Sequence, residues 1–353
     1  MPVLPQKFRK NHILSPIGWI YGIATGIRNF MFDCGLKKET AFSVPVINIG
    51  NITVGGTGKT PHTEYLIELL KNKYNIAVLS RGYKRRTKGF VLAQAGCNAE
   101  TIGDEPYQIY CKYPDITVAV CENRVQGINT LMASVHPDMV ILDDAYQHRY
   151  VKPGVNIMLT DFNRFILFDS LIPAGRLRES KKGIRRADIV VVTKCPENVD
   201  TGAVTDMLRK HTSASILFSR FVYRNLEKFN GNALIGFDGV SDKDSILLVS
   251  GIANPSVLID KLRKHTDNIQ VIQYADHHRF SDKDLALIEN RYQILKQNTV
   301  GKTYVFTTQK DAARLRSFNT LPSFAENLWV VPIKVDFIGE DISDYLSKLD
   351  CQP

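Results

Sequence analysis

The stretch at residues 46–61, VINIGNITVGGTGKTP, constrains the fold of this 353-residue chain more than any other. An apolar, β-branched run leads into the glycines, and an amphipathic helix is predicted over residues 62–73. Strand, glycine loop and helix in this order are the context of a phosphate-binding P-loop, where backbone N–H groups curl around an anion. Lys59 can then reach the β- and γ-phosphates, and Thr60 can ligate Mg²⁺. The alternative is a glycine-rich turn that only joins strand to helix.

The loop departs from the standard P-loop pattern at one position. Thr53 stands where the pattern has glycine, five residues before the Gly58-Lys59 pair. The predicted nucleotide-binding residues are those of the loop: Thr53, Val54, Gly55, Gly56, Thr57, Gly58, Lys59 and Thr60.

Most of the chain alternates between predicted strands and helices. Up to about residue 223, strands are expected at 46–49, 76–80, 116–121, 139–142, 155–160, 189–193 and 216–221. Nearly continuous Val, Ile and Leu runs are typical of parallel strands covered on both faces. We therefore expect an α/β fold of the P-loop NTPase type, with a doubly wound, mainly parallel sheet and a ligand at the carboxyl ends of its strands.

A second, smaller α/β lobe is expected after a polar segment rich in Gly and Asn. The predicted division is an N-terminal helical segment at 1–38, a P-loop core at 39–223, a linker at 224–244 that can form a β-hairpin, and a C-terminal lobe at 245–353. Its last predicted strand covers residues 328–333.

The net charge limits the class of partner, and the cysteine content limits the cellular compartment. The net charge of +9 suits an anionic partner, although a merely basic surface would also produce it. Six cysteines without a CxxC pair indicate neither a zinc site nor a disulfide framework, which favours a reducing cytosol. No nucleic-acid-reading pattern and no obligate protein partner is evident, so neither is predicted.

The N-terminal segment combines basic and apolar residues. Lys7, Arg9 and Lys10 precede an uncharged run at 12–27, which Arg28 ends. The run is shorter than the roughly 20 apolar residues that span a bilayer, and no small-residue cleavage site follows it. It suits an amphipathic helix on an anionic membrane surface, or a helix packed on the core; the pattern alone does not decide.

Paired acids follow the predicted strand in MVILDDAYQHR (139–149). Asp143 and Asp144 stand where a Walker B acid binds Mg²⁺, or they form a simple turn. Gln147 and His148 lie just beyond, and His148 either contacts substrate or binds a loop carbonyl.

Two further segments carry acids and imidazoles. Asp104 and Glu105 precede a predicted helix at 107–112 and could serve only as helix-terminal acids. Asp276, His277 and His278 follow a predicted strand of the smaller lobe, where proton handling is favoured over metal binding.

Basic loops supply candidate phosphate ligands. Arg81 begins a run of cations at 81–88 that attracts anions or forms a solvated turn, and Arg176 and Arg178 in PAGRLRE can clamp phosphates bidentately. The nucleotide is expected to be ATP, because Cys195-Pro196 stands where guanine recognition needs an acid.

Together these segments resemble the tetraacyldisaccharide 4′-kinase family of lipid A biosynthesis. The resemblance is carried by SVPVINIGNITVGGTGKTP (43–61), SRGY (80–83), GDEP (103–106), ILDDAYQHR (141–149), PAGRLRE (173–179), DHHRF (276–280) and TTQKDAARL (307–315). Thr53 is itself part of this family's pattern, whereas Ala145-Tyr146 replaces the expected Gly-Phe.

The resemblance implies a kinase that transfers the γ-phosphate of ATP to the 4′-hydroxyl of a tetraacyldisaccharide 1-phosphate, giving lipid IVA. It also implies Mg²⁺, a lipid disaccharide substrate, and a peripheral or monotopic place on the cytoplasmic face of the bacterial inner membrane. A two-stranded linker would join the lobes, with catalysis in the cleft. The alternative is a membrane-associated P-loop nucleotide switch, against which the DHH segment and the arginine-rich loops argue.

The same resemblance assigns roles. Asp104 would activate the sugar hydroxyl with His277 as its partner across the cleft, although the roles of His277 and His278 could be exchanged. The implied catalytic residues are Asp104, His277, Lys59, Asp276, Arg178 and Glu179. The implied metal ligands are Thr60, Asp143 and Asp144, and the implied substrate-binding residues are Arg81, Gln147, His148 and Arg176.

Overall fold

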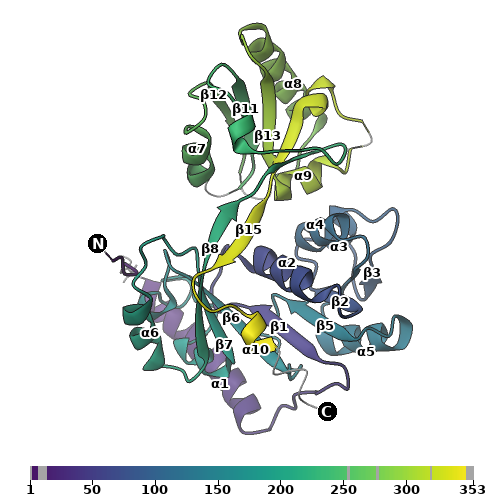
Figure 1. Ribbon diagram of the computed structural model, residues 1–353. Helices are drawn as coiled ribbons and strands as arrows, with labels where there is room; N and C mark the ends of the chain where they lie inside the picture. Colours follow the sequence, from purple (N-terminus) through teal and green to yellow (C-terminus); the bar gives the residue numbers. More distant parts are fainter. Residues whose placement is uncertain (1, 7–13, 253–254, 276–277, 319, 347–353) are drawn as a thin grey trace.

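The computed structural model describes residues 2–6, 14–252, 255–275, 278–318 and 320–346, which form two α/β lobes (Figure 1). The larger lobe contains a nine-stranded sheet in the order β15-β8-β7-β6-β1-β5-β2-β4-β3, and the smaller a six-stranded sheet in the order β10-β9-β14-β13-β11-β12. The strands of the larger sheet are β1 (Val46–Gly50), β2 (Ile76–Ser80), β3 (Val91–Leu92), β4 (Thr117–Val120), β5 (Met139–Asp143), β6 (Val155–Asp161), β7 (Ile189–Thr193), β8 (Ser215–Tyr223) and β15 (Ile333–Phe337). Those of the smaller sheet are β9 (Leu226–Lys228), β10 (Leu234–Ile235), β11 (Ser245–Ser250), β12 (Ile269–Gln273), β13 (Thr303–Thr308) and β14 (Leu328–Val331).

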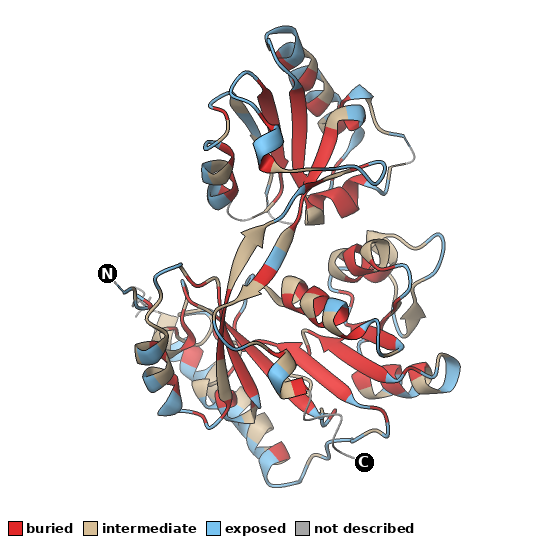
Figure 2. Ribbon diagram, in the orientation of Figure 1, coloured by how far each residue is buried: buried red, intermediate tan, exposed pale blue. Residues whose placement is uncertain are grey.

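The larger sheet is parallel except at its two edges. Only β3 and β15 among its strands pair in antiparallel fashion, with β4 and β8 respectively. Strands β1, β2, β5 and β7 are buried at every residue (Figure 2), as their continuous apolar sequences predict. The expected doubly wound, mainly parallel sheet is confirmed.

Helices cover both faces of each sheet. Helices α2, α4 and α10 pack on one face of the larger sheet, and α5 and α6 on the other. In the smaller lobe α8 and α9 share one core and α7 the other. The helices are α1 (Ser15–Asp33), α2 (Lys59–Leu70), α3 (Ala99–Ile102), α4 (Asp104–Lys112), α5 (Arg124–Ser134), α6 (Thr201–Arg209), α7 (Ser256–Leu262), α8 (Asp282–Gln297), α9 (Gln309–Leu315) and α10 (Ser343–Leu346).

The chain crosses between the lobes twice, through β8 and β15. These strands pair in antiparallel fashion, from Ile333 opposite Tyr223 to Phe337 opposite Ser219, and form the ribbon between the lobes in Figure 1. Residues 224–244 hold a hairpin of β9 and β10, but β9 also pairs with β14, so this hairpin is an edge of the smaller sheet.

The single strand expected at 328–333 is therefore two strands in different sheets. Strand β14 stops before Pro332, which has no N–H to continue the ladder, and β15 returns to the larger sheet. Ile342 and Leu346 then pack in the core of the larger lobe. Residues 333–346 thus lie with the larger sheet and not with the C-terminal lobe.

Helix α1 lies against the larger lobe with one face and exposes the other. Gly18 is buried, and a Cβ at Gly22 would lie 2.6 Å from the side chain of Leu171, so the helix approaches this loop closely. Its opposite face carries large apolar side chains that are 55–74% exposed: Ile17, Trp19, Ile20, Ile23, Ile27 and Phe30. The helix therefore combines packing on the protein with an uncovered apolar face.

Candidate active site

The phosphate loop lies between the carboxyl end of β1 and the first turn of α2. Gly58 is the N-cap of α2 with a φ of 90°, a left-handed conformation that glycine adopts without steric cost. No side chain of the described residues caps this helix, so its first N–H groups are left to bind an anion.

Hydrogen bonds from neighbouring strands hold the loop in place. The Asn51 amide donates to the Thr57 hydroxyl at 2.6 Å, and the Thr193 hydroxyl donates to the Thr57 carbonyl at 2.8 Å. Lys194 Nζ donates to the Gly56 carbonyl at 2.5 Å. Because these donors lie at the ends of β1 and β7, the loop is held in shape by the sheet itself.

A buried histidine ties the loop to the ribbon between the lobes. His62 Nδ1 lies 2.8 Å from the Gly58 carbonyl oxygen, and Nε2 lies 2.9 Å from Ser219 Oγ on β8. Burial lowers the pKa of His62 to about 4, so the ring is neutral near pH 7. A carbonyl only accepts, which places the proton on Nδ1 and makes Nε2 an acceptor for Ser219.

The lysine of the loop faces the paired acids of β5. Lys59 Nζ lies 3.6 Å from Asp144 Oδ1, and Arg178 Nη1 lies 3.3 Å from the same oxygen. Asp143 is buried and accepts a hydrogen bond from Thr63 at 3.1 Å. Burial, together with the carboxylates of Glu105 and Asp144, raises the pKa of Asp143 to about 7.

These groups fit a magnesium ion that also binds nucleotide phosphates. Mg²⁺ usually takes one or two carboxylates and completes its shell with phosphates and water. Asp143, Asp144 and the buried Thr60 provide such a set beside the loop. The described residues include no cluster of three or more His, Cys, Asp and Glu side chains that could hold a metal ion by themselves. The donor set therefore fits a metal that arrives with the nucleotide.

A cavity of about 540 Å³, which we call the arginine pocket, opens beside the paired acids. One wall is the inner face of α1, and the others come from the loops after β2, β4 and β5 and from the segment around Arg178. Its lining residues are Tyr21, Thr25, Arg28, Asn29, Ser80, Arg81, Tyr83, Glu105, Glu122, Arg124, Asp144, Gln147, His148, Arg178 and Glu179.

Most of the predicted substrate-binding and catalytic residues of the larger lobe meet in this pocket. Arg81, Gln147, His148, Arg178 and Glu179 all line it. Glu179 is buried and accepts hydrogen bonds from Asn29, Gln147 and Arg186, at 2.8, 3.1 and 2.9 Å. Its carboxylate thus anchors the pocket wall.

Arg176 lies elsewhere, against the phosphate loop. Its Nη1 would be 3.5 Å from a Cβ at Gly55, and its carbonyl accepts a hydrogen bond from the Val54 N–H at 2.7 Å. This position suits a contact with nucleotide phosphate better than the contact with the acceptor that we predicted from sequence.

The residues of α1 that line the pocket were missed from sequence. The Tyr21 hydroxyl donates to the Arg178 carbonyl, and Arg28 Nη2 donates to the Gln147 carbonyl, both at 2.8 Å. Tyr21, Thr25, Arg28 and Asn29 share one helix face at spacings of four, three and one residues. This stripe of polar residues within an apolar run is the sequence signal that could have identified them.

The smaller lobe contacts the larger lobe next to the site through ion pairs between α9 and α4. Arg314 of α9 binds Asp104 at the start of α4, with Nη2 2.9 Å from Oδ2, and also binds the buried Asp311 at 2.9 Å. Lys310 lies 3.3 Å from Glu105. Asp104 therefore stands at the boundary between the lobes.

The predicted histidine partner of Asp104 lies outside the described residues. Neither Asp276 nor His277 is among the residues that the structure describes. The predicted pairing of Asp104 with His277 therefore stays a prediction. His278 is described: Nε2 lies 3.1 Å from Asp284 Oδ2, and the ring stacks on Tyr274. These contacts hold His278 within its own lobe.

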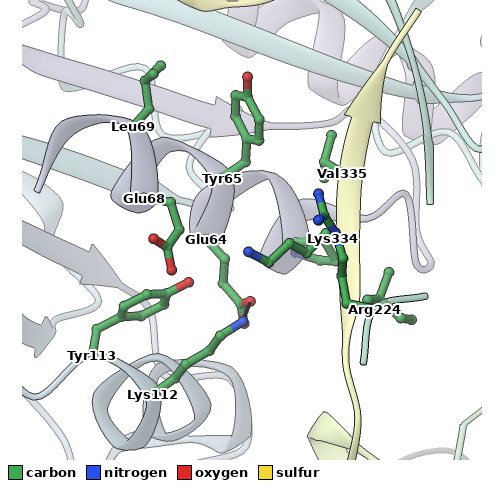
Figure 3. Close-up of a pocket in the computed structure, with 11 residues that line it drawn as sticks. Glu64, Tyr65, Glu68, Leu69, Lys112, Tyr113, Arg224, Lys334 and Val335 are labelled. Carbon is green, nitrogen blue, oxygen red and sulfur yellow. Dashed lines mark hydrogen bonds and ion pairs between the residues drawn. The ribbon is translucent and has the colours of Figure 1, made fainter. Parts of the chain in front are cut away.

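A second cavity, of about 280 Å³, lies between α2, the end of α4 and β15 (Figure 3). Its charged side chains include Glu64 and Lys112, which pair with each other, and Glu64 also accepts a hydrogen bond from Gln108 at 2.6 Å. Only Pro61 represents the first turn of α2 in its lining. The cavity thus runs along the flank of α2, apart from the anion-binding end of this helix.

Known proteins match the chain over almost its full length. The family model described as tetraacyldisaccharide-1-P 4′-kinase matches residues 10–349. The chain belongs to this family. A tetraacyldisaccharide 4′-kinase from Bacteroides fragilis is 46% identical over 335 residues, covering 92% of this chain and 88% of the relative. One from Flavobacterium johnsoniae is 44% identical over 331 residues, covering 93% of each chain.

A solved structure supports membership of the tetraacyldisaccharide 4′-kinase family. The crystal structure of LpxK from Aquifex aeolicus in complex with ATP matches with a TM-score of 0.74 and 28% identity, over 96% of this chain and 97% of that one. The resemblance predicted from the sequence segments is therefore confirmed, as is the P-loop kinase fold.

Proposed function

We infer that the protein is a lipid A 4′-kinase, which uses ATP to phosphorylate the 4′-hydroxyl of tetraacyldisaccharide 1-phosphate. The observation that carries this conclusion is the whole-length family match, together with a phosphate loop that faces a polar pocket beside α1. In the reaction the 4′-oxygen bonds to the γ-phosphorus, the bond to the β–γ bridging oxygen breaks, and ADP leaves.

The proposed roles follow from where the side chains lie. The first N–H groups of α2 and Lys59 hold the β- and γ-phosphates, with Arg176 beside the loop. Asp143, Asp144 and Thr60 hold Mg²⁺, which neutralises phosphate charge when bound. Arg178, Gln147, His148, Arg81 and Glu179 form the acceptor side.

Asp104 is the proposed acceptor of the hydroxyl proton. It stands at the start of α4 next to Glu105, which lines the arginine pocket. Its contact with Arg314 holds the carboxylate at the boundary between the lobes. His277 is proposed as its partner on the strength of the family resemblance, and Asp276 as a neighbouring acid.

The exposed face of α1 supports a place on an anionic membrane surface. Across the described part of the chain, none of the helices has both the length and the apolar character to cross a bilayer. Six exposed apolar side chains instead form one face of α1, while its polar stripe lines the pocket. A peripheral or monotopic protein on the cytoplasmic face of the inner membrane fits this division, because the acceptor is a lipid.

The deciding experiment incubates the protein with γ-labelled ATP and the lipid disaccharide 1-phosphate. We expect label in a lipid product that carries phosphate at the 4′ position. Release of label only as inorganic phosphate would instead support a nucleotide switch and overturn the kinase assignment.

Membrane attachment is tested by replacing Trp19, Ile20 and Ile23 with Gln, a good helix former. Burying each apolar side chain in a membrane is worth about 1.5–3 kcal/mol, so flotation with phosphatidylglycerol vesicles should largely disappear. Deleting α1 is a poorer test, because Arg28 and Asn29 of the pocket wall would be lost as well. Flotation equal to the unaltered protein would show that this face does not bind lipid.

A further inference from the structure

The carboxylate of Asp104, the proposed proton acceptor, is bound by a side chain of the other lobe. Arg314 of α9 is a buried arginine, 5% exposed. Its Nε and Nη2 both donate to Asp104 Oδ2, at 3.2 and 2.9 Å. Because two donors of one rigid, planar guanidinium meet at a single carboxylate oxygen, they fix the place of that oxygen.

Arg314 is in turn anchored by the sheet of the smaller lobe. Its Nη1 donates to Oδ1 of the fully buried Asp311 at 2.9 Å. Asp311 Oδ2 accepts hydrogen bonds from the Gly251 N–H at 2.9 Å and from the Thr308 hydroxyl at 2.7 Å, at the carboxyl ends of β11 and β13. A Cβ at Gly251 would lie 2.9 Å from Asp311 Oδ1, so this close approach requires glycine. The guanidinium therefore stands in a place that the fold of the smaller lobe determines.

Helices α9 and α4 pack against each other at this boundary (Figure 1). Ala313, the residue before Arg314, is buried in an apolar cluster with Ile102 and Tyr107 of the larger lobe. The ion pair of Arg314 with Asp104 lies beside this packed contact, and the two side chains are 5% and 29% exposed. Partly buried ion pairs are screened by salt much less than exposed ones. This contact is therefore stronger than an ion pair on an open surface.

The backbone of Asp104, by contrast, is placed by the larger lobe. Gly103 is the N-cap of α4 with a φ of 94°, and a Cβ there would lie 3.1 Å from the carbonyl oxygen of Tyr83. Tyr83 follows β2 and lines the arginine pocket, so the start of α4 lies directly against a wall of this pocket. The larger lobe thus sets where the backbone of Asp104 lies, and Arg314 of the smaller lobe sets where its carboxylate lies.

A simpler account is that Arg314 only neutralises the buried Asp311. A buried carboxylate does need a cation, and the contact of Nη1 with Asp311 provides one. That account leaves the other two nitrogen atoms unexplained, because both are directed across the boundary to Asp104. Serving both carboxylates at once requires the fixed fork of an arginine, which the single ammonium of a lysine cannot replace.

We propose that Arg314 is a positioning residue for phosphoryl transfer, which holds the Asp104 carboxylate where it accepts the proton of the 4′-hydroxyl. The inference rests on the proposed kinase function and on Asp104 as its general base. A general base acts from about 2.6–3.2 Å, and a misplacement of about 1 Å can cost about 10² in rate. Because Arg314 belongs to the smaller lobe, the base is in position only while α9 is docked on α4.

The test is a kinetic cycle of Arg314→Gln, Asp104→Asn and the variant with both changes, using γ-labelled ATP and the lipid disaccharide 1-phosphate. Glutamine keeps an amide donor for Asp311 but has no charge. Arg314→Gln should lower kcat by about 10- to 100-fold, with KM for ATP and for the lipid changed less than about twofold. Added to Asp104→Asn, the same change should lower kcat by less than about twofold, because no base is left to position.

Arg314→Lys and Lys310→Met complete the set of variants. Arg314→Lys keeps a charge beside Asp311, so it provides a folded variant for the same cycle if Arg314→Gln unfolds. It should recover part of the loss in kcat, and its remaining loss should also disappear on Asp104→Asn. Lys310→Met is the matched control, because Lys310 crosses the same boundary from the same helix and binds Glu105 at 3.3 Å. It should lower kcat by less than about twofold. Thermal unfolding checks that all variants are folded.

Several results would overturn the role of Arg314. A loss of the same factor with and without Asp104→Asn would show that Arg314 only docks the lobes. A rise in KM at unchanged kcat would assign it to substrate binding. Normal turnover of a folded Arg314→Gln, or of Asp104→Asn, would show that no base is positioned by this contact. None of these results affects the kinase assignment, which fails only if the unaltered protein transfers no label to the lipid.

Discussion

The two ends of the site differ in the kind of polar atom that the protein leaves without a partner. At the phosphate loop, Thr57, Gly56 and Gly58 are each held by a hydrogen bond from a side chain of the same lobe. The buried atoms without a partner there are two oxygens, Asn51 Oδ1 and Thr53 Oγ1. In the arginine pocket, three cations face a neutral histidine, and a buried guanidinium nitrogen has no partner among the described residues. The phosphate-loop end therefore leaves oxygen atoms unpaired beside a loop that is already held in shape, whereas the arginine pocket leaves an N–H donor of a guanidinium unpaired.

The nucleotide end depends most on Lys59. Lys59→Ala removes the cation that faces the transferring phosphate, and a single such cation is worth about 10³–10⁵ in turnover. We expect nearly complete loss of transfer, with the unfolding temperature little changed because Lys59 makes one loose ion pair, at 3.6 Å to Asp144. Turnover is measured with labelled ATP and folding by calorimetry, and a folded variant with normal turnover would remove the P-loop assignment.

At the acceptor end, Asp104 should have the next largest effect. Asp104→Ala should lower kcat by about 10²–10⁴ with ATP affinity little changed, because a general base acts on the hydroxyl and not on the nucleotide. His277→Ala should lose somewhat less, and His278→Ala should be mild, since His278 is already bound to Asp284. The double variant of Asp104 and His277 should be little worse than Asp104→Ala; multiplicative losses would show that the two act independently.

Metal binding at the nucleotide end should weaken in mild acid. The pKa of Asp143 is raised to about 7, so the carboxyl takes up a proton as the pH falls through 7, and a protonated carboxyl does not ligate Mg²⁺. The Mg²⁺ affinity of the nucleotide complex should be constant above pH 7 and fall by about tenfold per pH unit below it. Titrations from pH 5.5 to 8.5 measure this, with Asp143→Asn as a control that reports protonation of the nucleotide phosphate alone. A pH profile of the same shape as that of Asp143→Asn would show that Asp143 is not a ligand.

The smallest predicted effect tests how rigid the phosphate loop is. Ser219→Ala leaves His62 Nε2 without its donor, and the loss of one buried hydrogen bond costs about 0.5–1.5 kcal/mol. KM for ATP should rise by about 2- to 10-fold while KM for the lipid is unchanged. Equal changes in both constants would mean that the bond supports the fold in general and not the loop.

Local sequence was sufficient for the elements whose signal is local. The apolar strands and the loop before Lys59 could be predicted because continuous Val and Ile runs and clustered glycines fix the backbone over a few residues. The paired acids could be placed because they end a strand adjacent to β1 in a parallel sheet. The residues that line the arginine pocket, by contrast, come from distant segments, and only the complete fold shows which of these segments meet.

Three features could not be predicted for that reason. The return of β15 to the larger sheet depends on pairing between residues more than a hundred positions apart, at Ile333 and Tyr223. Arg124 follows a strand like many surface residues, and only the full fold shows that it is buried. The polar stripe of α1 was visible, but whether it faced water or protein depended on the docking of the whole helix.

The ribbon of β8 and β15 has a mechanical consequence. Both crossings of the described chain between the lobes run through these paired strands, so a rotation of the smaller lobe would bend them. Phe221 of β8 lies directly over the phosphate loop, where a Cβ at Gly58 would be 2.4 Å from its ring. A change in the ribbon that moved Arg314 away from Asp104 would therefore also shift Phe221 relative to Gly58, the N-cap of α2. The connection between the lobes and the wall of the phosphate loop are thus one piece of backbone.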